Sequence, residues 1–170
     1  MVEMHLKQYL DLGKAGQLKL APCSLSSLVD ETVALLQPQC QHARITLNWI
    51  RPEDDYTIEA DANHLAHLVL NLTTNAMEAA GPGGTVSVDL SRDDRNITVT
   101  VRDSGKGPTN EVAEHLFEPF VTGKPDGVGL GLAVAKQIVE AHGGKIRWER
   151  QDESTVFFVQ LSRSETRVES

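Results

Sequence analysis

The sequence predicts one α+β domain, a two-layer α/β sandwich in which helices cover one face of a single mixed or antiparallel sheet. Helical and strand patterns are grouped along the chain and do not alternate strictly, which favours this class. Two pairs of alternating apolar segments predict hairpins over residues 86–101 and 145–161. The length of 170 residues suits one domain with a proper core.

The first third of the chain predicts two helices and two short strands. Apolar residues at helical spacing over residues 1–12 are typical of the end of an amphipathic helix, and an extended connector is expected after it. Ser24 is a good helix N-cap and begins the second helix, which Pro38 is expected to kink or end. Alternating residues predict strands over 44–50 and 56–58.

The rest of the chain predicts two more helices between the hairpins. A long helix is expected from its N-cap Asp61 to about Ala80, where a Gly-Pro-Gly-Gly run ends it. A helical pattern from residue 132 ends near Gly144. Residues 163–170 read as a polar tail.

Composition excludes several classes of function. The net charge of −8 disfavours a nucleic-acid partner, because a phosphate backbone requires a basic surface. Cys23 and Cys40 have neither disulfide-framework nor metal-ligand spacing, which fits a reducing compartment. No apolar run approaches the roughly 20 residues of a membrane span. We therefore expect a cytoplasmic segment without membrane contact, a placement compatible with a membrane-anchored parent protein.

Two glycine clusters, residues 103–107 and 127–131, indicate an anion site. Glycines let backbone amides approach a ligand closely, and a helix that begins at such a cluster directs N–H groups at a phosphate. Taken singly, the first cluster is equally typical of a turn after a strand, and the second of a loop before a helix. The spacing fits neither a dinucleotide fingerprint, which needs a strand directly before the glycines, nor a P-loop, because Pro125 follows Lys124.

Polar residues share one face of the predicted 61–80 helix. Asn71, Asn75 and Glu78 are spaced i, i+4 and i+7, about one turn apart. An amide oxygen can ligate Mg²⁺, which takes its other ligands from water and substrate phosphates. The alternative is that both asparagines merely face solvent on an amphipathic helix.

Four segments in order resemble the N, G1, F and G2 boxes of histidine-kinase ATP-binding domains, from the superfamily shared with gyrase-type ATPases. They are residues 71–79, 103–107, 117–120 and 127–132, and the resemblance covers roughly residues 20–162. The run Phe-Glu-Pro-Phe-Val-Thr-Gly-Lys with its short continuation is most similar to sensor kinases of the nitrogen-regulation type. The resemblance implies a Bergerat-type fold with a mixed, mostly antiparallel sheet.

The resemblance also implies roles for individual residues. Asp103 would accept a hydrogen bond from the adenine amino group. Guanine has a carbonyl at that position, which cannot donate a hydrogen bond. Asn75 would bind Mg²⁺, with Asn71 completing that catalytic site and Lys124 contacting a phosphate. The implied ATP-binding residues are Asn75, Asp103, Gly105, Gly107, Phe117, Phe120, Lys124, Gly127, Gly129, Leu130, Gly131 and Thr155.

Three departures from the family pattern refine this expectation. Asn71 stands where gyrase-like hydrolases carry a glutamate general base, so efficient ATP hydrolysis is not expected. Glu78 stands where many relatives carry a lysine or arginine that reaches the phosphates. Lys124 is therefore the more important candidate for a positively charged phosphate contact. None of the six histidines is directly followed by an acidic residue and then by a proline, as a phosphoacceptor would be.

We therefore expect the catalytic half of a two-component sensor histidine kinase, over residues 17–162. Residues 1–16 would end an upstream dimerisation helix, and the acceptor histidine would lie on a dimerisation domain of the same or another polypeptide. A response regulator would act downstream. The alternatives are a nucleotide-binding regulatory module and an anti-sigma-type serine kinase, which Asn71 disfavours.

Overall fold

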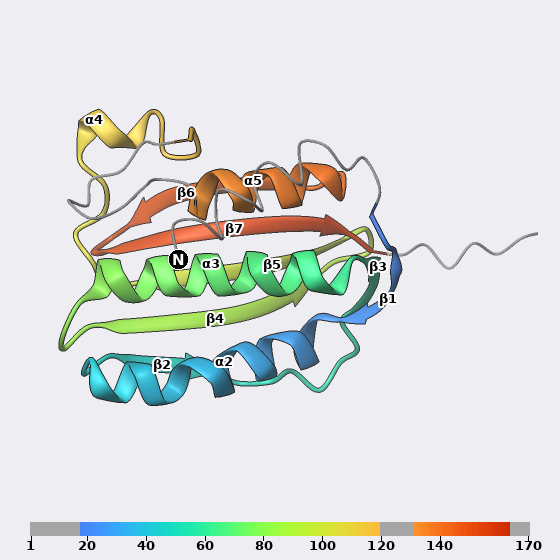
Figure 1. The fold of residues 1–170 in the computed structure, drawn as a ribbon, viewed down its shortest axis with the longest axis horizontal. Coiled ribbons are helices and arrows are strands. Elements are labelled where there is room, and N and C mark those ends of the chain that lie inside the picture. The colour runs from blue at the N-terminus through green and yellow to red at the C-terminus, as the bar shows by residue number, and fades with distance from the viewer. Residues whose placement is uncertain (1–17, 120–130, 164–170) are drawn as a thin grey trace, which may run out of the picture.

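A computed structural model of the chain describes residues 18–119 and 131–163, and Figure 1 shows their arrangement. The elements in chain order are β1 (Ala21–Ser24), α2 (Leu25–His42), β2 (Thr46–Trp49), β3 (Thr57–Ala60), α3 (Ala62–Ala80), β4 (Thr85–Arg92), β5 (Asn96–Asp103), α4 (Asn110–Ala113), α5 (Gly131–Ala141), β6 (Lys145–Gln151) and β7 (Ser154–Ser162). The expected helix over residues 1–12 and the polar tail beyond residue 163 lie outside the described residues.

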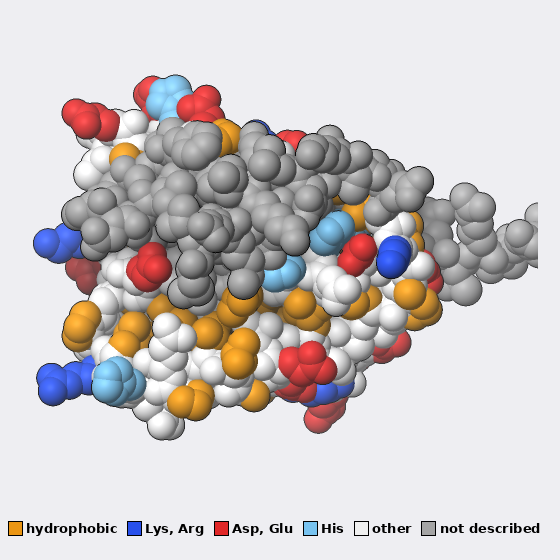
Figure 2. Space-filling model, viewed as in Figure 1, with side chains coloured by type: hydrophobic (Ala, Val, Ile, Leu, Met, Phe, Trp, Pro, Cys, Tyr) orange, Lys and Arg blue, Asp and Glu red, His pale blue; other side chains and the backbone are white. Residues whose placement is uncertain are grey.

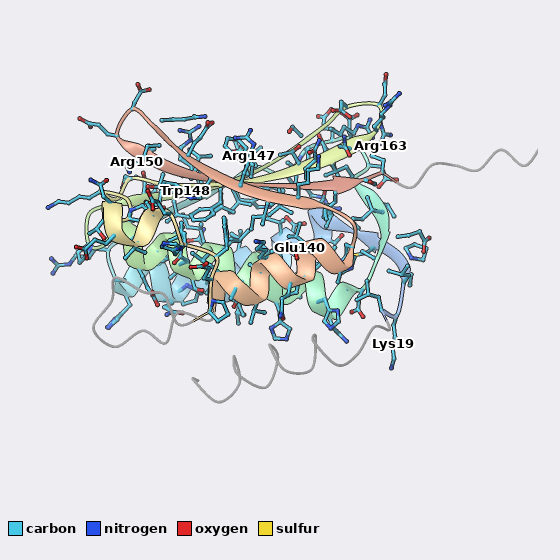
Figure 3. All side chains as sticks on the ribbon, turned by 90° about the horizontal axis from the view of Figure 1, so that it is seen from above. Lys19, Glu140, Arg147, Trp148, Arg150 and Arg163 are labelled. Carbon is cyan, nitrogen blue, oxygen red and sulfur yellow. The ribbon has the colours of Figure 1, made fainter. Side chains whose placement is uncertain are left out.

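The main sheet has five strands in the order β2-β4-β5-β7-β6. β2 runs parallel to β4, and all other pairs are antiparallel, so the sheet is mixed and mostly antiparallel as expected. Helices α2, α3 and α5 lie on one face of this sheet, which Figure 3 shows edge-on. The α+β sandwich predicted from the sequence is confirmed.

A second, two-stranded sheet differs from the single sheet that was expected. β3 does not join the main sheet but pairs antiparallel with β1, which occupies the end of the predicted extended connector. Cys23 and Ile58 face the core from this pair. The pairing partner of a four-residue strand depends on tertiary contacts that a local pattern does not contain.

The second helix begins as predicted but does not end at Pro38. Ser24 is its N-cap, and the Ser24 hydroxyl accepts a hydrogen bond from the backbone N–H of Ser27 at 3.2 Å. The helix continues through Pro38 to His42, so the expectation that Pro38 could end it is wrong. Leu36 and Cys40 are buried on both sides of Pro38 and hold the last turn against the core, which outweighs the local cost of proline.

The N-terminus of α3 is fixed by its cap residue, as the sequence predicts. The two carboxylate oxygens of Asp61 accept hydrogen bonds from the backbone N–H groups of His64 and Lys19, at 3.2 and 3.1 Å. Burial alone would raise the pKa of Asp61, but these hydrogen bonds and nearby His64 lower it below its ordinary value. His142, just beyond α5, accepts the backbone N–H of Asp61 on Nε2 at 3.1 Å and ties the ends of α3 and α5 together.

The core lies between the helices and the sheet. Its largest fully buried side chains come from α2, α3, β3, β4, β5, α5 and β7: Leu25, Val29, Ile58, Leu65, Leu68, Val69, Leu72, Val86, Ile97, Ile138 and Leu161. On the face drawn in Figure 2, acidic and basic side chains are both scattered among apolar ones. Among the residues that the structure describes, no helix is long and apolar enough to cross a bilayer.

Candidate nucleotide-binding site

The predicted adenine-binding carboxylate lies at the end of the central strand. Asp103 is the last residue of β5 and is only 1% exposed. Thr155 lies directly opposite on β7 and is 3% exposed. Directly paired residues on antiparallel strands project to the same face of the sheet, so the carboxylate and the hydroxyl are neighbours on the helix-covered side. The register of β5 and β7 thus brings together two of the predicted site residues.

A tight turn follows Asp103 and is held by its own side chain. The carboxylate oxygen Oδ1 accepts a hydrogen bond from the backbone N–H of Gly105 at 2.8 Å. Ser104 anchors the turn to β4 through two bonds: its N–H donates to the Thr85 carbonyl at 3.1 Å, and its hydroxyl accepts from the Thr85 N–H at 2.9 Å. The turn is therefore joined to both the sheet and the buried carboxylate.

Both glycines of this turn are required by its close packing. A Cβ atom at Gly105 would lie 2.3 Å from the Ala79 carbonyl oxygen at the end of α3. Gly107 has φ +81°, and a Cβ there would lie 2.8 Å from Cδ of Arg150. The expected role of these glycines was close approach of the backbone to a bound ligand. The structure adds a second reason, which is the close approach of α3 and β6 to the turn.

The asparagine face of α3 lies towards the start of α5. Asn71 is 6% exposed, and its side-chain N–H group donates to the Gly131 carbonyl at 3.4 Å. Its oxygen Oδ1 is then the atom with which Asn71 can accept a hydrogen bond or ligate a cation. Asn75, one turn further on, is half-buried, and Glu78 is exposed. Through Asn71, the predicted N box contacts Gly131, the first residue of the helix that follows the second glycine cluster.

These residues fit a hydrated Mg²⁺ better than a closed metal cage. Within residues 18–119 and 131–163, no group of three or more His, Cys, Asp or Glu side chains could hold a metal ion. Mg²⁺ commonly keeps several waters and uses one or two protein oxygens together with substrate phosphates. One or two amide oxygens on a helix face are a suitable donor set for such an ion.

Phe117 joins the segment after the turn to the same sheet. Its ring makes an edge-to-face contact with Phe157 of β7, with centroids 6.0 Å apart and an interplanar angle of 84°. Phe157 is two residues from Thr155, so Phe117 lies near the predicted adenine end. Five other predicted site residues lie outside the described residues: Phe120, Lys124, Gly127, Gly129 and Leu130.

Arg150 belongs to this site and is absent from the sequence-based prediction. Its guanidinium Nη1 donates to the Gly105 carbonyl at 2.6 Å and to the Thr155 hydroxyl at 2.7 Å. The available signal was the hairpin of β6 and β7, whose register places Arg150 opposite Thr155. Reading that signal required the exact register, which the turn between the strands determines.

Comparisons with known proteins identify the family to which this fold belongs. Residues 60–165 match the model of the family described as histidine kinase-, DNA gyrase B- and HSP90-like ATPase. The sensor histidine kinase ZraS of Salmonella typhimurium is 38% identical over 144 residues, which cover 84% of this chain and 31% of ZraS. The chain thus spans about a third of the length of this curated relative.

Solved structures of the same class superimpose on most of the chain. The nucleotide-free catalytic domain of histidine kinase ThkA has a TM-score of 0.77 and 28% identity, covering 86% of this chain and 97% of that one. ThkA in complex with the response regulator protein TrrA has a TM-score of 0.81 and 27% identity, covering 96% of this chain and 47% of that one. The chain therefore belongs to the histidine kinase-, DNA gyrase B- and HSP90-like ATPase family and has the fold of a histidine-kinase catalytic domain.

Proposed function

We propose that this domain binds Mg²⁺-ATP and transfers the γ-phosphoryl group to a histidine on the dimerisation domain of a two-component sensor kinase. The observation that carries the proposal is the buried Asp103 carboxylate beside Thr155, at a glycine turn within a histidine-kinase-like fold. Residues 17–162 would form the catalytic domain, and residues 1–16 the end of the dimerisation helix.

Adenine recognition follows from the hydrogen-bonding capacity of this pair. An ionised carboxylate only accepts hydrogen bonds, so Asp103 suits the exocyclic amino group of adenine and rejects the carbonyl of guanine. In a dry site, a mispaired polar group costs about 1–3 kcal/mol. Because Asp103 is almost fully buried, water cannot easily correct a mismatch there.

Phosphoryl transfer in this site would rest on positioning and charge neutralisation. Bound Mg²⁺ would neutralise and orient the phosphates, with Asn75 as protein ligand and Asn71 beside it. Lys124 would contact the phosphates, and the start of α5 would offer them its N–H groups. An asparagine amide takes no proton at neutral pH, so Asn71 cannot activate water and ATP is conserved for a protein acceptor.

Two partners follow from this proposal. The first is the histidine-bearing dimerisation domain, on the same or another polypeptide, which would receive the phosphoryl group. The second is a response regulator, the class of partner found in the ThkA complex. A nucleotide-binding regulatory module is the competing function, and it differs by giving no phosphorylated acceptor.

Asn75→Ala is expected to remove the Mg²⁺-dependent part of ATP binding, about tenfold in affinity or 1.4 kcal/mol, and to leave adenosine binding unchanged. The reason is that Asn75 would act at the phosphates through the metal, whereas the base is held by Asp103. Calorimetric titrations of ATP with and without Mg²⁺, and of adenosine, measure both effects.

The matched control is Asn63→Ala, which makes the same change at an exposed position on the same helix. It should behave as the parent protein. If Mg²⁺ strengthens ATP binding equally in Asn75→Ala and in the parent, Asn75 is not the metal ligand.

A further inference from the structure

Two arginines of β6 project to opposite faces of the sheet. Arg147 lies on the face away from the helices, with its guanidinium 3.9 Å from the ring centroid of Phe158 and 3.6 Å from the Glu149 carboxylate. Arg150 is an odd number of positions further along the strand, so it projects to the other face. Both are labelled in Figure 3. Arg150 is therefore on the side of the sheet that carries Asp103 and Thr155.

The Arg150 side chain contacts the turn at two points and strand β7 at a third. Its guanidinium Nη1 is 2.6 Å from the Gly105 carbonyl oxygen and 2.7 Å from the Thr155 hydroxyl. Its aliphatic stem fills the space beside Gly107, where an added Cβ would lie 2.8 Å from Cδ. One side chain thus links both glycines of the turn to β7. Because the two acceptors share one charged donor group, removing the guanidinium leaves both without this partner.

The bond from Arg150 determines whether the Thr155 hydroxyl acts as a donor or as an acceptor towards its other partner. A guanidinium has donors only, so the Thr155 oxygen must accept from Arg150 and its hydrogen must be donated elsewhere. Asp103, directly opposite, is an acceptor when ionised. The pair can therefore offer a ligand one acceptor, an oxygen of Asp103, and one donor, the hydroxyl of Thr155. Adenine carries the complementary set, an amino donor beside the ring acceptor N1, whereas hypoxanthine carries a carbonyl beside an N1–H donor.

We propose that Arg150 is a positioning residue that determines base specificity: it holds residues 103–107 against β7 and keeps the Thr155 hydroxyl a donor. The inference rests on the proposed ATP-binding function and adds a residue to its site. Arg150 acts through the turn and through Thr155, and no contact between Arg150 and the nucleotide is required.

The test compares Arg150→Met with Arg147→Met on the same strand. Methionine keeps an unbranched apolar stem and removes every donor. We expect Arg150→Met to weaken ATP and adenosine binding by the same factor, about tenfold, with the effect of Mg²⁺ unchanged. The preference for ATP over inosine triphosphate should fall several-fold, and Arg150→Lys should restore part of it. Arg147→Met should bind both nucleotides as the parent does.

A double-mutant cycle with Thr155→Val isolates the hydroxyl. If Arg150 acts through that hydroxyl, Arg150→Met should not reduce the ATP preference any further in the Thr155→Val background. Amide hydrogen exchange at Gly105 in the nucleotide-free proteins reports on the turn itself. It should be faster in Arg150→Met than in the parent and in Arg147→Met.

The outcomes separate this inference from the proposed function. An unchanged ATP-to-inosine-triphosphate ratio in Arg150→Met, in a parent that binds ATP, overturns the role of Arg150 alone. If Arg150→Met loses the same factor of affinity for both nucleotides, Arg150 has only a structural role, and its role in specificity is overturned as well. A parent protein that binds neither nucleotide overturns the proposed function, and the specificity role falls with it.

Discussion

Asp103→Asn is expected to abolish measurable ATP binding while the domain remains folded. Oδ1 of Asp103 accepts the Gly105 N–H, so an asparagine oxygen can keep this bond and preserve the turn. The NH₂ group then takes the place of the other carboxylate oxygen and faces the adenine amino group, donor against donor. Two mispaired groups in a buried site cost about 1–3 kcal/mol each. Isothermal titration calorimetry with ATP and thermal unfolding measure the two effects.

Asp89→Asn on the neighbouring strand β4 is the matched control, because Asp89 is exposed and the change of charge is the same. It should bind ATP as the parent protein does. If Asp103→Asn keeps the parental affinity for ATP, Asp103 does not recognise the base, and adenine binds elsewhere.

Gly105→Ala is expected to lower both the free energy of unfolding and the affinity for ATP. The added Cβ would lie 2.3 Å from the carbonyl oxygen of Ala79 and 2.9 Å from Oδ1 of Asp103. The first neighbour is backbone at the end of α3, which cannot rotate away, so the turn must move and carry Asp103 with it. Overpacking of this kind costs about 1–3 kcal/mol. Urea unfolding and ATP titration of the same preparation give both quantities.

Gly131→Ala controls for the loss of a glycine as such. No atom lies within 4 Å of a Cβ built at Gly131 in the described part of the chain, and alanine is the better helix former. Its stability should equal or exceed that of the parent. A Gly105→Ala protein with parental stability would mean that α3 and the turn are not packed as closely as the distances indicate.

Helices α2, α3 and α5 and the two hairpins were predictable because their signals are local. The caps Ser24 and Asp61 each satisfy backbone N–H groups within three residues of themselves, and both were identified from residue type and position. Pro38 shows the limit of this reasoning. Its local preference to end a helix is overruled by Leu36 and Cys40, whose burial depends on elements distant in sequence.

Residue type and motif were enough to propose Asp103 and Thr155 for the candidate site, but they did not predict how the site residues are arranged. Asp103 stands out as the acidic residue of a glycine cluster, whereas its neighbour Thr155 is paired with it only through the register of β5 and β7. Arg150 carries no motif, and a charged residue in an edge strand ordinarily faces solvent. Only the hairpin register and the path of the turn reveal its two acceptors.

The most direct test of the proposed kinase activity is transfer of the labelled γ-phosphoryl group of ATP to a separate histidine-bearing dimerisation domain. The account predicts acid-labile, alkali-stable phosphate on the acceptor, dependent on Mg²⁺, absent when the acceptor histidine is replaced, and lost in Asp103→Asn. ATP that binds normally while the acceptor stays unlabelled, or acid-stable phosphate on a serine, would contradict it.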